Sequence, residues 1–444
     1  MERMYNVLSI VVVLLVLLAA CGPAPTPETP TEKAPAEEAT ENLEGKVTIW
    51  YSQGATWSEP IQEMKDALKK LHPGIEMEFV TNDPEQLSSK LVAAFAAGSP
   101  PDVCFGQEAR ILTVEQELEG WADLSGYIDS DPEFAAMVAA LPESQMRSYW
   151  KGDKLWALPE VVQTIGIFVR KSWLEEIGGE VPTDWEEMTD IAVKFTKPDK
   201  YGYCIFGVPG VNNSAGTQFV YTGAAAGMEY PVMDPDGNLT FNTERGVEVL
   251  KWLYRWHHVD KVTPPSLAAF GVKEFYAAVK AGQCGMGRVG AWNIGAWKDS
   301  EIGEDFIIIP YPPMEKGQAE PNYQVAWNNG LAMSKDPTPE AYAVFKFLLS
   351  KEVQEIFFPY RTSWARADLD FDTLMGDNEL LLYYSEPQPH YAPEQMVTQP
   401  CWLSTLDILS KHINAMYTDP DLDPEKVLQD AYDEATAKCE EIGE

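Results

Sequence analysis

The chain has 444 residues, of which 45% are hydrophobic and 23% charged, and its mean hydropathy is -0.24. These values exclude a wholly disordered chain, a coiled coil and a polytopic membrane protein. The formal net charge is -36, which argues against nucleic acid as a partner and disfavours anionic lipid surfaces and anionic substrates.

The N-terminus has the pattern of an export signal. The apolar run from Val7 to Ala20 is interrupted only by Ser9 and is shorter than the roughly 20 residues that span a bilayer. Cys21 follows small residues directly, as in a bacterial lipoprotein signal. We therefore expect residues 1–20 to be a signal peptide and Cys21 to carry lipid that holds the protein on the outer face of the cell membrane, or in the periplasm. An ordinary signal peptide with a chance Cys is the alternative.

Residues 21–44 contain five prolines and six Glu against one Lys. Such a segment cannot bury a core, so we expect a disordered Pro/Glu-rich tether.

Five cysteines lie beyond the tether, at Cys104, Cys204, Cys284, Cys401 and Cys439. An odd number in an exported protein means at least one free thiol, and the spacing fixes no disulfide pairing. No close Cys/His spacing supports zinc binding, so we expect no metal site.

Strands and helices alternate in the first part of the body, which predicts α/β layers. The predicted order is strand 46–50, helix 58–71, strand 75–80, helix 87–97 and strand 101–105. The middle and end are more helical, with helices over 173–178, 185–195, 244–258, 275–281, 340–349 and 351–358, a strand over 306–309 and a last helix from Pro424. Asp184, Thr243 and Asp423 are the expected helix caps. The 400 residues of the body, 45–444, indicate at least two domains.

Motifs for catalysis or cofactors are weak. The run Gly285–Gly290 formally fits G-x-G-x-x-G but lacks the strand-then-helix context of a dinucleotide site, so we expect no cofactor. His257 and His258 are adjacent and should point to different sides of a helix. The carboxylates are too numerous to rank, so a secreted carbohydrate-active hydrolase stays as an alternative.

Six ordered stretches resemble one family. They are Leu71–Met77, Ala93–Phe105, Gly152–Pro159, Pro182–Glu187, Phe275–Met286 and Phe347–Gln354. Together they resemble the extracellular solute-binding proteins of bacterial ABC importers, of the maltose- and oligosaccharide-binding type, over nearly all of 45–444.

The resemblance implies an α/β fold of the two-lobe, periplasmic-binding-protein-like type II, with a hinge and a ligand cleft between the lobes. It places crossings between lobes around Val161–Val169 and Phe306–Tyr311. Lobe one would comprise 45–161 and 311–356, and lobe two 162–310 and 357–444. The implied function is capture of a sugar, most simply an oligosaccharide, by lobe closure and delivery to the membrane subunits of an ABC permease, by a monomer and without catalysis.

A neutral sugar site needs aromatic platforms and planar polar groups. The family places ligand contacts in the loop after strand 101–105, near Gln163 and at the aromatic residue Trp292, while the Pro expected beside Arg366 is absent. Trp173, Trp185, Trp252 and Trp256 are expected in the core. The candidate ligand-binding residues are Trp57, Gln107, Glu108, Arg110, Glu160, Gln163, Asn212, Gln218, Trp292, Trp327, Asn328, Trp364, Arg366 and Trp402.

Overall fold

The structure, a computed structural model, describes residues 43–51, 58–83, 86–211, 213–234, 236–318, 324–361, 365–375, 391–392 and 399–443. Within these ranges, no helix combines the length and the apolar character needed to cross a membrane. Cys21 and residues 22–42 of the predicted tether lie outside the described residues, whereas Glu44, predicted to end the tether, begins β1.

The strands, in chain order, are β1 (Glu44–Tyr51), β2 (Gly74–Thr81), β3 (Val103–Gln107), β4 (Trp150–Lys151), β5 (Lys154–Leu155), β6 (Leu158–Val169), β7 (Tyr201–Cys204), β8 (Cys284–Gly290), β9 (Ile307–Ile309), β10 (Gln324–Met333) and β11 (Tyr391–Ala392).

The helices of the first half are α1 (Ser58–Leu71), α2 (Leu87–Ala96), α3 (Glu108–Leu118), α4 (Ser125–Ser130), α5 (Pro132–Ala139), α6 (Glu143–Met146), α7 (Lys171–Glu176), α8 (Trp185–Phe195) and α9 (Ala215–Ala225). Those of the second half are α10 (Glu244–Tyr254), α11 (Val272–Lys280), α12 (Trp292–Trp297), α13 (Pro339–Leu349), α14 (Lys351–Arg361), α15 (Phe371–Met375), α17 (Trp402–Thr418) and α18 (Pro424–Gly443).

Most predicted elements are confirmed, and the capping residues explain why. Asp184 accepts a hydrogen bond from the backbone of Glu187 at 2.9 Å, which fixes the start of α8 at the predicted residue. α11 begins three residues before the predicted start, because the Glu274 carboxylate accepts from the Gly271 N–H at 3.1 Å and so caps an earlier turn.

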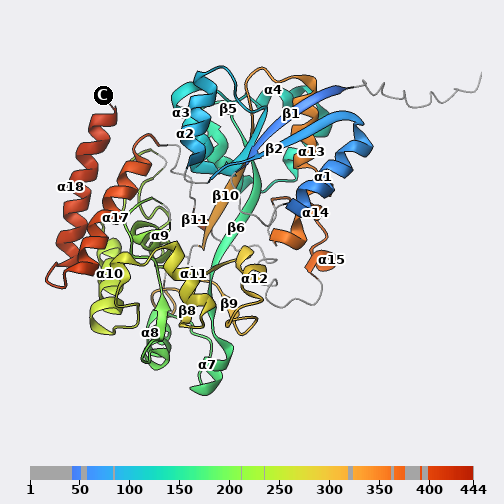
Figure 1. The fold of residues 1–444 in the computed structure, drawn as a ribbon. Coiled ribbons are helices and arrows are strands. Elements are labelled where there is room, and N and C mark those ends of the chain that lie inside the picture. The colour runs from blue at the N-terminus through green and yellow to red at the C-terminus, as the bar shows by residue number, and fades with distance from the viewer. Residues whose placement is uncertain are drawn as a thin grey trace, which may run out of the picture. The chain divides into compact units, whose positions relative to one another are not determined.

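One mixed sheet organises the described chain (Figure 1). Its strand order is β2-β1-β3-β10-β6-β8-β7, with β11 beside β10 and β9 beside β6. The pairs β1–β2, β1–β3 and β7–β8 are parallel, and β10 and β6 are antiparallel to their neighbours in the path.

β6 changes partners along its length. Its first half, as far as Thr164, pairs with β10, and its second half, from Ile165, pairs with β8 and β9. Figure 1 shows β6 and β10 running from the layer that holds β1 and β2 toward the layer that holds β8 and β9. β6 therefore connects the two parts of the sheet, because its two halves pair with different strands.

The tryptophans expected in the core are buried, with one qualification. Trp173, Trp185 and Trp256 are at most 9% exposed. The Trp185 indole donates to the Pro312 carbonyl at 2.9 Å, and the Trp256 indole donates to the Thr189 hydroxyl at 2.7 Å. Trp252 packs edge-on against Trp185 but is only half-buried.

Two disulfides join residues distant in sequence. Cys204 on β7 bonds to Cys284 on β8, and Cys401 bonds to Cys439 near the end of α18. Cys104 on β3 is left as a buried free thiol, which confirms the expectation of at least one unpaired cysteine.

The two adjacent histidines do not point apart, contrary to the sequence-based expectation. α10 passes into a π-helical turn, Arg255–Val259, whose wider backbone lets the rings of His257 and His258 meet with centroids 4.6 Å apart. Nε2 of His257 lies 3.2 Å from the Tyr417 carbonyl, and Nε2 of His258 lies 2.8 Å from that of Met416. Both rings thus contact the last turn of α17.

Removing the longer-range disulfide should destabilise the fold. The bridge between Cys204 and Cys284 closes a sequence separation of 80 residues. Replacing both by Ala should lower the free energy of unfolding by about 2–4 kcal/mol in denaturant titrations, because the unfolded chain gains conformational freedom. The matched control replaces Cys401 and Cys439, which span 38 residues, and should cost slightly less. Unchanged stability in both double variants would contradict this expectation.

Acid should weaken the fold through His257. Burial, and secondarily the neighbouring His258, lower the pKa of His257 to about 4, against about 6.5 in an unfolded chain. Between these two pH values the unfolded state binds more protons, so the free energy of unfolding falls as the pH decreases. His257→Gln should make this dependence shallower in urea titrations at pH 7 and pH 4.5. Identical slopes for the wild type and His257→Gln would count against the explanation.

Candidate functional site

Several candidate residues lie on three neighbouring strands, close to the point where β6 changes partners. Gln107, the last residue of β3, is paired with Asn329 of β10, which in turn is paired with Val161 of β6. Two residues farther along the same strands, Trp327 is paired with Gln163. The sheet therefore gathers strand positions that are distant in sequence.

Side chains of this row are described at some positions only. The side chains of Gln163, Trp327 and Asn328 lie outside the description, although their strand positions are defined. Glu160 is 3% exposed, and its carbonyl accepts a hydrogen bond from the Gln354 amide of α14 at 2.9 Å. Asn329 is also buried, and its side-chain Nδ2 has no hydrogen-bond partner in the described part.

The start of α3 continues this region, because β3 leads directly into it. Glu108 begins α3 and is 2% exposed, and Arg110, two residues later in the helix, is half-buried. The Arg110 carbonyl accepts from the Ser88 hydroxyl at 3.0 Å, which ties α3 to α2. The loop expected after β3 is therefore absent, because Gln107 ends β3 and Glu108 already begins α3.

Other candidates lie elsewhere or outside the description. Trp57, Asn212 and Trp364 belong to the undescribed residues. Arg366 is buried and donates from Nε and Nη2 to the Asp368 carboxylate at 2.8 and 2.7 Å, and these hydrogen bonds lower the pKa of Asp368. Trp402 is 5% exposed and packs in the main hydrophobic core at the start of α17. The ligand contacts suggested for Arg366 and Trp402 stay predictions.

A second group of side chains surrounds Arg288 on β8. Gly290 ends β8 and is paired with Ile165, next to the pair formed by Thr164 and Ala326 of β10. Arg288 is therefore two residues from the point where β6 exchanges β10 for β8. α9, which carries Gln218 and Tyr221, contacts β10. The Arg288 group thus adjoins the row on β3, β10 and β6.

Arg288 is enclosed mainly by aromatic rings. Its guanidinium carbon lies 5.0 Å from the ring centroid of Phe206, 5.6 Å from that of Tyr221 and 5.9 Å from that of Trp292. Nη1 donates to the Tyr221 hydroxyl at 2.8 Å. Burial acts to lower the pKa of Arg288, but nearby tyrosines, Tyr221 first, outweigh it and the pKa lies above its ordinary value. Arg288 is consequently a cation at any physiological pH.

Trp292, the predicted stacking residue, is held at the end of β8. A Cβ at Gly290 would overlap the Trp292 ring, so only glycine lets the indole cover this strand end. The Trp292 indole and the Asn293 side-chain amide both donate to the Tyr276 hydroxyl, at 3.2 and 3.3 Å. The side-chain oxygen of Asn293, Oδ1, accepts from the Gly290 N–H at 2.9 Å. The half-buried indole is therefore fixed in orientation.

Gln218 lies deeper, among tyrosines. It is fully buried, and its amide oxygen and nitrogen have no hydrogen-bond partner among the described residues. Burial raises the pKa of Tyr203, and its neighbours Tyr311 and Gln218 oppose that change. Tyr311 lies 5.9 Å, centroid to centroid, from Tyr221. This cluster therefore connects Gln218 to the surroundings of Arg288.

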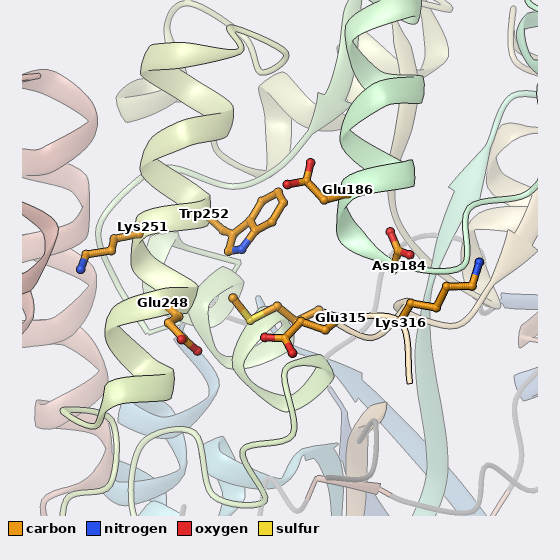
Figure 2. Close-up of a pocket in the computed structure, with 8 residues that line it drawn as sticks. Asp184, Glu186, Glu248, Lys251, Trp252, Glu315 and Lys316 are labelled. Atoms are coloured by element: carbon orange, nitrogen blue, oxygen red, sulfur yellow. The ribbon is translucent and has the colours of Figure 1, made fainter. Parts of the chain in front are cut away.

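A separate surface pocket of about 510 Å³ lies between α8, α10 and residues 314–316. Figure 2 shows the Trp252 indole extending from α10 into this pocket, with Lys251 pointing away from it. Its charged groups are already matched, since Arg255 stacks on Trp252 at 4.6 Å and pairs with Glu186 at 2.9 Å. The remaining lining residues are Asp184, Glu248, Met314, Glu315 and Lys316. The pocket thus offers paired charges and a single ring.

No described group of three or more His, Cys, Asp or Glu side chains is placed to hold a metal ion. The glycine-rich run Gly285–Gly290 forms β8, a buried strand, rather than a loop that opens a helix on phosphate. The described site therefore offers hydrogen bonding and aromatic contact.

Comparison with solved structures shows the fold. An ABC transporter solute-binding protein of Thermotoga lettingae, bound to α-D-tagatose, superposes with a TM-score of 0.73 at 17% identity, covering 89% of this chain and 99% of that one. Maltose-bound MalE3 of T. maritima gives a TM-score of 0.69 at 17% identity, covering 88% and 99%. The chain has the mixed α/β, two-lobe fold of periplasmic solute-binding proteins.

Sequence comparison shows the family. Residues 51–355 match the bacterial extracellular solute-binding protein family, and the chain belongs to it. A putative binding protein of Brucella abortus is 24% identical over 406 residues, covering 88% of this chain and 93% of that protein. An arabinooligosaccharide-binding protein of Halalkalibacterium halodurans is 20% identical over 241 residues, covering 52% of this chain and 51% of that one.

Sequence reasoning missed Arg288 and Tyr221. A signal for Arg288 was present, since it is the only charged residue in the strand Cys284–Gly290 and the neighbouring positions are small or apolar. A lone charge in a buried strand requires an explanation. Tyr221 gave no such signal, because its proximity to Arg288 arises from the packing of α9 near β8.

Replacing Arg288 should cost little stability, unlike replacing Arg170. Arg170 donates from Nε and Nη2 to Asp305, whose side chain is 30% exposed. Arg170→Met should lower the free energy of unfolding by about 1–3 kcal/mol, because a partly buried carboxylate loses its partner. Arg288→Met leaves no carboxylate unpaired and should cost less than about 1 kcal/mol by the same reasoning. Urea titration measures the free energy of unfolding of both variants. A larger loss of stability in Arg288→Met than in Arg170→Met would contradict this expectation.

Proposed function

We propose that the chain is the substrate-binding component of an ABC transporter, which captures an oligosaccharide between two lobes and delivers it unaltered to a membrane permease. The observation that carries the proposal is membership of the extracellular solute-binding family. The sugar class rests on relatives described as arabinooligosaccharide- and fructooligosaccharide-binding, and on neighbours solved with tagatose and maltose. The aromatic and amide groups near the β6 junction suit such a ligand.

The change of partners along β6 supports a division into lobes. We propose the division expected from the sequence, 45–161 and 311–356 for lobe one and 162–310 and 357–444 for lobe two, with one change at its last boundary. The exchange between Thr164 and Ile165 falls within the expected crossing, Val161–Val169. Residue 356 lies inside the continuous helix α14, so we place the return to lobe two after Arg361.

Closure of the two lobes is the proposed mechanism. Ligand contacts made from both lobes favour the closed arrangement over the open one, because only the closed arrangement offers all of them. β6 and β10 are the segments that bending would affect. The permease would then recognise the closed, loaded form, and a monomer suffices for this.

The N-terminal segment fits the same role. Lipid on Cys21 would hold the protein at the outer face of the membrane, and the acidic, Pro-rich residues 21–44 would let the body move near the permease. A relative in Streptomyces antibioticus is described as a lipoprotein, over a match that covers 54% of this chain. The family match favours binding over the hydrolase alternative, and we propose no catalytic residues.

Binding should appear as thermal stabilisation. A sugar present at about 100 times its dissociation constant stabilises the folded state by roughly 2.7 kcal/mol. The purified full chain should therefore show a raised melting temperature with the correct oligosaccharide, and calorimetry should give one site per chain. Reducing-end assays of the same mixtures should show no new ends. Failure of every carbohydrate in a broad panel to bind, or the appearance of new reducing ends, would overturn the proposal.

A further inference from the structure

Three arginines are buried among the described residues, namely Arg170, Arg288 and Arg366, with exposures of 7%, 6% and 6%. Two of them present the edge formed by Nε and Nη2 to a carboxylate. In Arg366 these atoms donate to the two carboxylate oxygens of Asp368 at 2.8 and 2.7 Å, which is the usual fork by which arginine holds a carboxylate. In Arg170 both atoms donate to a single oxygen of Asp305, Oδ2, at 2.9 and 2.7 Å.

Arg288 lacks that partner. Its side-chain contacts in the described chain are the hydrogen bond from Nη1 to the Tyr221 hydroxyl and the three aromatic rings. Within the described residues, Nε and Nη2 donate to no group and no Asp or Glu forms an ion pair with the guanidinium. Burying a cation without a counter-charge costs free energy. Contacts with aromatic rings offset only part of this cost.

The free edge is not completely enclosed. Nη1 of Arg170 and both amide atoms of Gln218 are fully enclosed without a partner, whereas Nε and Nη2 of Arg288 are not. Arg288 as a whole is 6% exposed. Its position, two residues before the Gly290–Ile165 pair, places it beside the junction of the lobes and next to the Trp292 indole.

We infer that Arg288 binds the carboxylate of an acidic sugar, such as a uronic acid unit, through Nε and Nη2. The inference rests on the proposed function and specifies its ligand. A carboxylate is planar and has two oxygens at the spacing of the two N–H groups, so it would complete at Arg288 the two-oxygen fork that Asp368 completes at Arg366. The half-buried indole of Trp292 offers a flat face beside it for the sugar ring.

The net charge of -36 disfavours anionic substrates at long range, but it does not decide binding at one enclosed guanidinium. Exposed carboxylates act on a ligand through water and salt, which screen charges beyond about 8 Å at physiological ionic strength. The guanidinium of Arg288 would act at hydrogen-bond distance in a poorly solvated surrounding, where the same charge interacts more strongly. The overall charge slows the approach of an anion, whereas the local charge governs its binding once it has arrived.

The test compares matched ligands by calorimetry on the full chain. Three series of trisaccharides serve as probes, based on galacturonate, glucuronate and mannuronate. Each series contains the uronic acid trisaccharide, the neutral trisaccharide of the same linkage, and a sulfated form of that neutral trisaccharide. The variants are Arg288→Met, which removes the charge, Arg288→Lys, which keeps the charge without the fork, and Arg255→Met.

Arg255→Met is the matched control. It removes a guanidinium that also stacks on an indole, but in the surface pocket beside Trp252, where Glu186 and Asp260 supply its carboxylate partners. Melting temperatures of all variants without ligand show whether each is folded.

We expect the wild type to bind one uronic series at least tenfold more tightly than its neutral and sulfated forms. Arg288→Met should lower the affinity for the acidic trisaccharide by about 10- to 100-fold, as expected when a hydrogen bond to a charged group is lost. The affinity for the neutral trisaccharide should change by less than about threefold. Arg288→Lys should fall between the wild type and Arg288→Met, and Arg255→Met should match the wild type.

Several results would overturn the inference. For the wild type, these are binding of the neutral trisaccharide as tightly as the acidic one or more tightly, and a preference for the sulfated form. For the variants, they are an equal loss of affinity for acidic and neutral trisaccharides in folded Arg288→Met, and loss of binding in Arg255→Met. Binding of neutral sugars alone would refute the acidic ligand and leave the proposed function standing. Absence of binding to every carbohydrate would instead refute the proposed function.

Discussion

Backbone pairing along β6 is the constraint on which the arrangement depends. The strand hydrogen-bonds with β10 as far as Thr164 and with β8 and β9 from Ile165 onward, so its two halves belong to different parts of the sheet. The row on β3 and β10 and the aromatic surroundings of Arg288 meet at this exchange. A bend there would move the two groups relative to each other while each keeps its own pairing.

Local signals made most elements predictable. Asp184 before Trp185, Thr243 before Glu244 and Pro424 after Asp423 fix helix starts through hydrogen bonds within a few residues, and α8, α10 and α18 begin where the sequence indicates. The end of α10 was not predictable in this way. Its π-helical turn, Arg255–Val259, places histidines against the carbonyls of α17, which lies some 160 residues farther along the chain.

The positions of candidate site residues were predictable only where the order of the strands brings them together. Gln107 lies on β3, and Glu160 and Gln163 lie on β6, in segments that the family resemblance already located. Glu160 and Gln163 are within two residues of Val161, which is linked to Gln107 through Asn329. Arg288 and Tyr221 meet because α9 packs near β8, and no spacing in the sequence encodes that contact. The net charge of the chain was equally uninformative about a single enclosed guanidinium, because a sum over 444 residues carries no information about position.

The odd thiol has a consequence for the exported protein. Thiol–disulfide exchange requires a thiolate that can reach a disulfide sulfur. Cys104 is fully buried, and that burial raises the pKa of its thiol, so the reactive ion is scarce and shielded from reagents. The bridges at Cys204–Cys284 and Cys401–Cys439 are therefore protected from scrambling by the chain's own cysteine for as long as β3 stays folded.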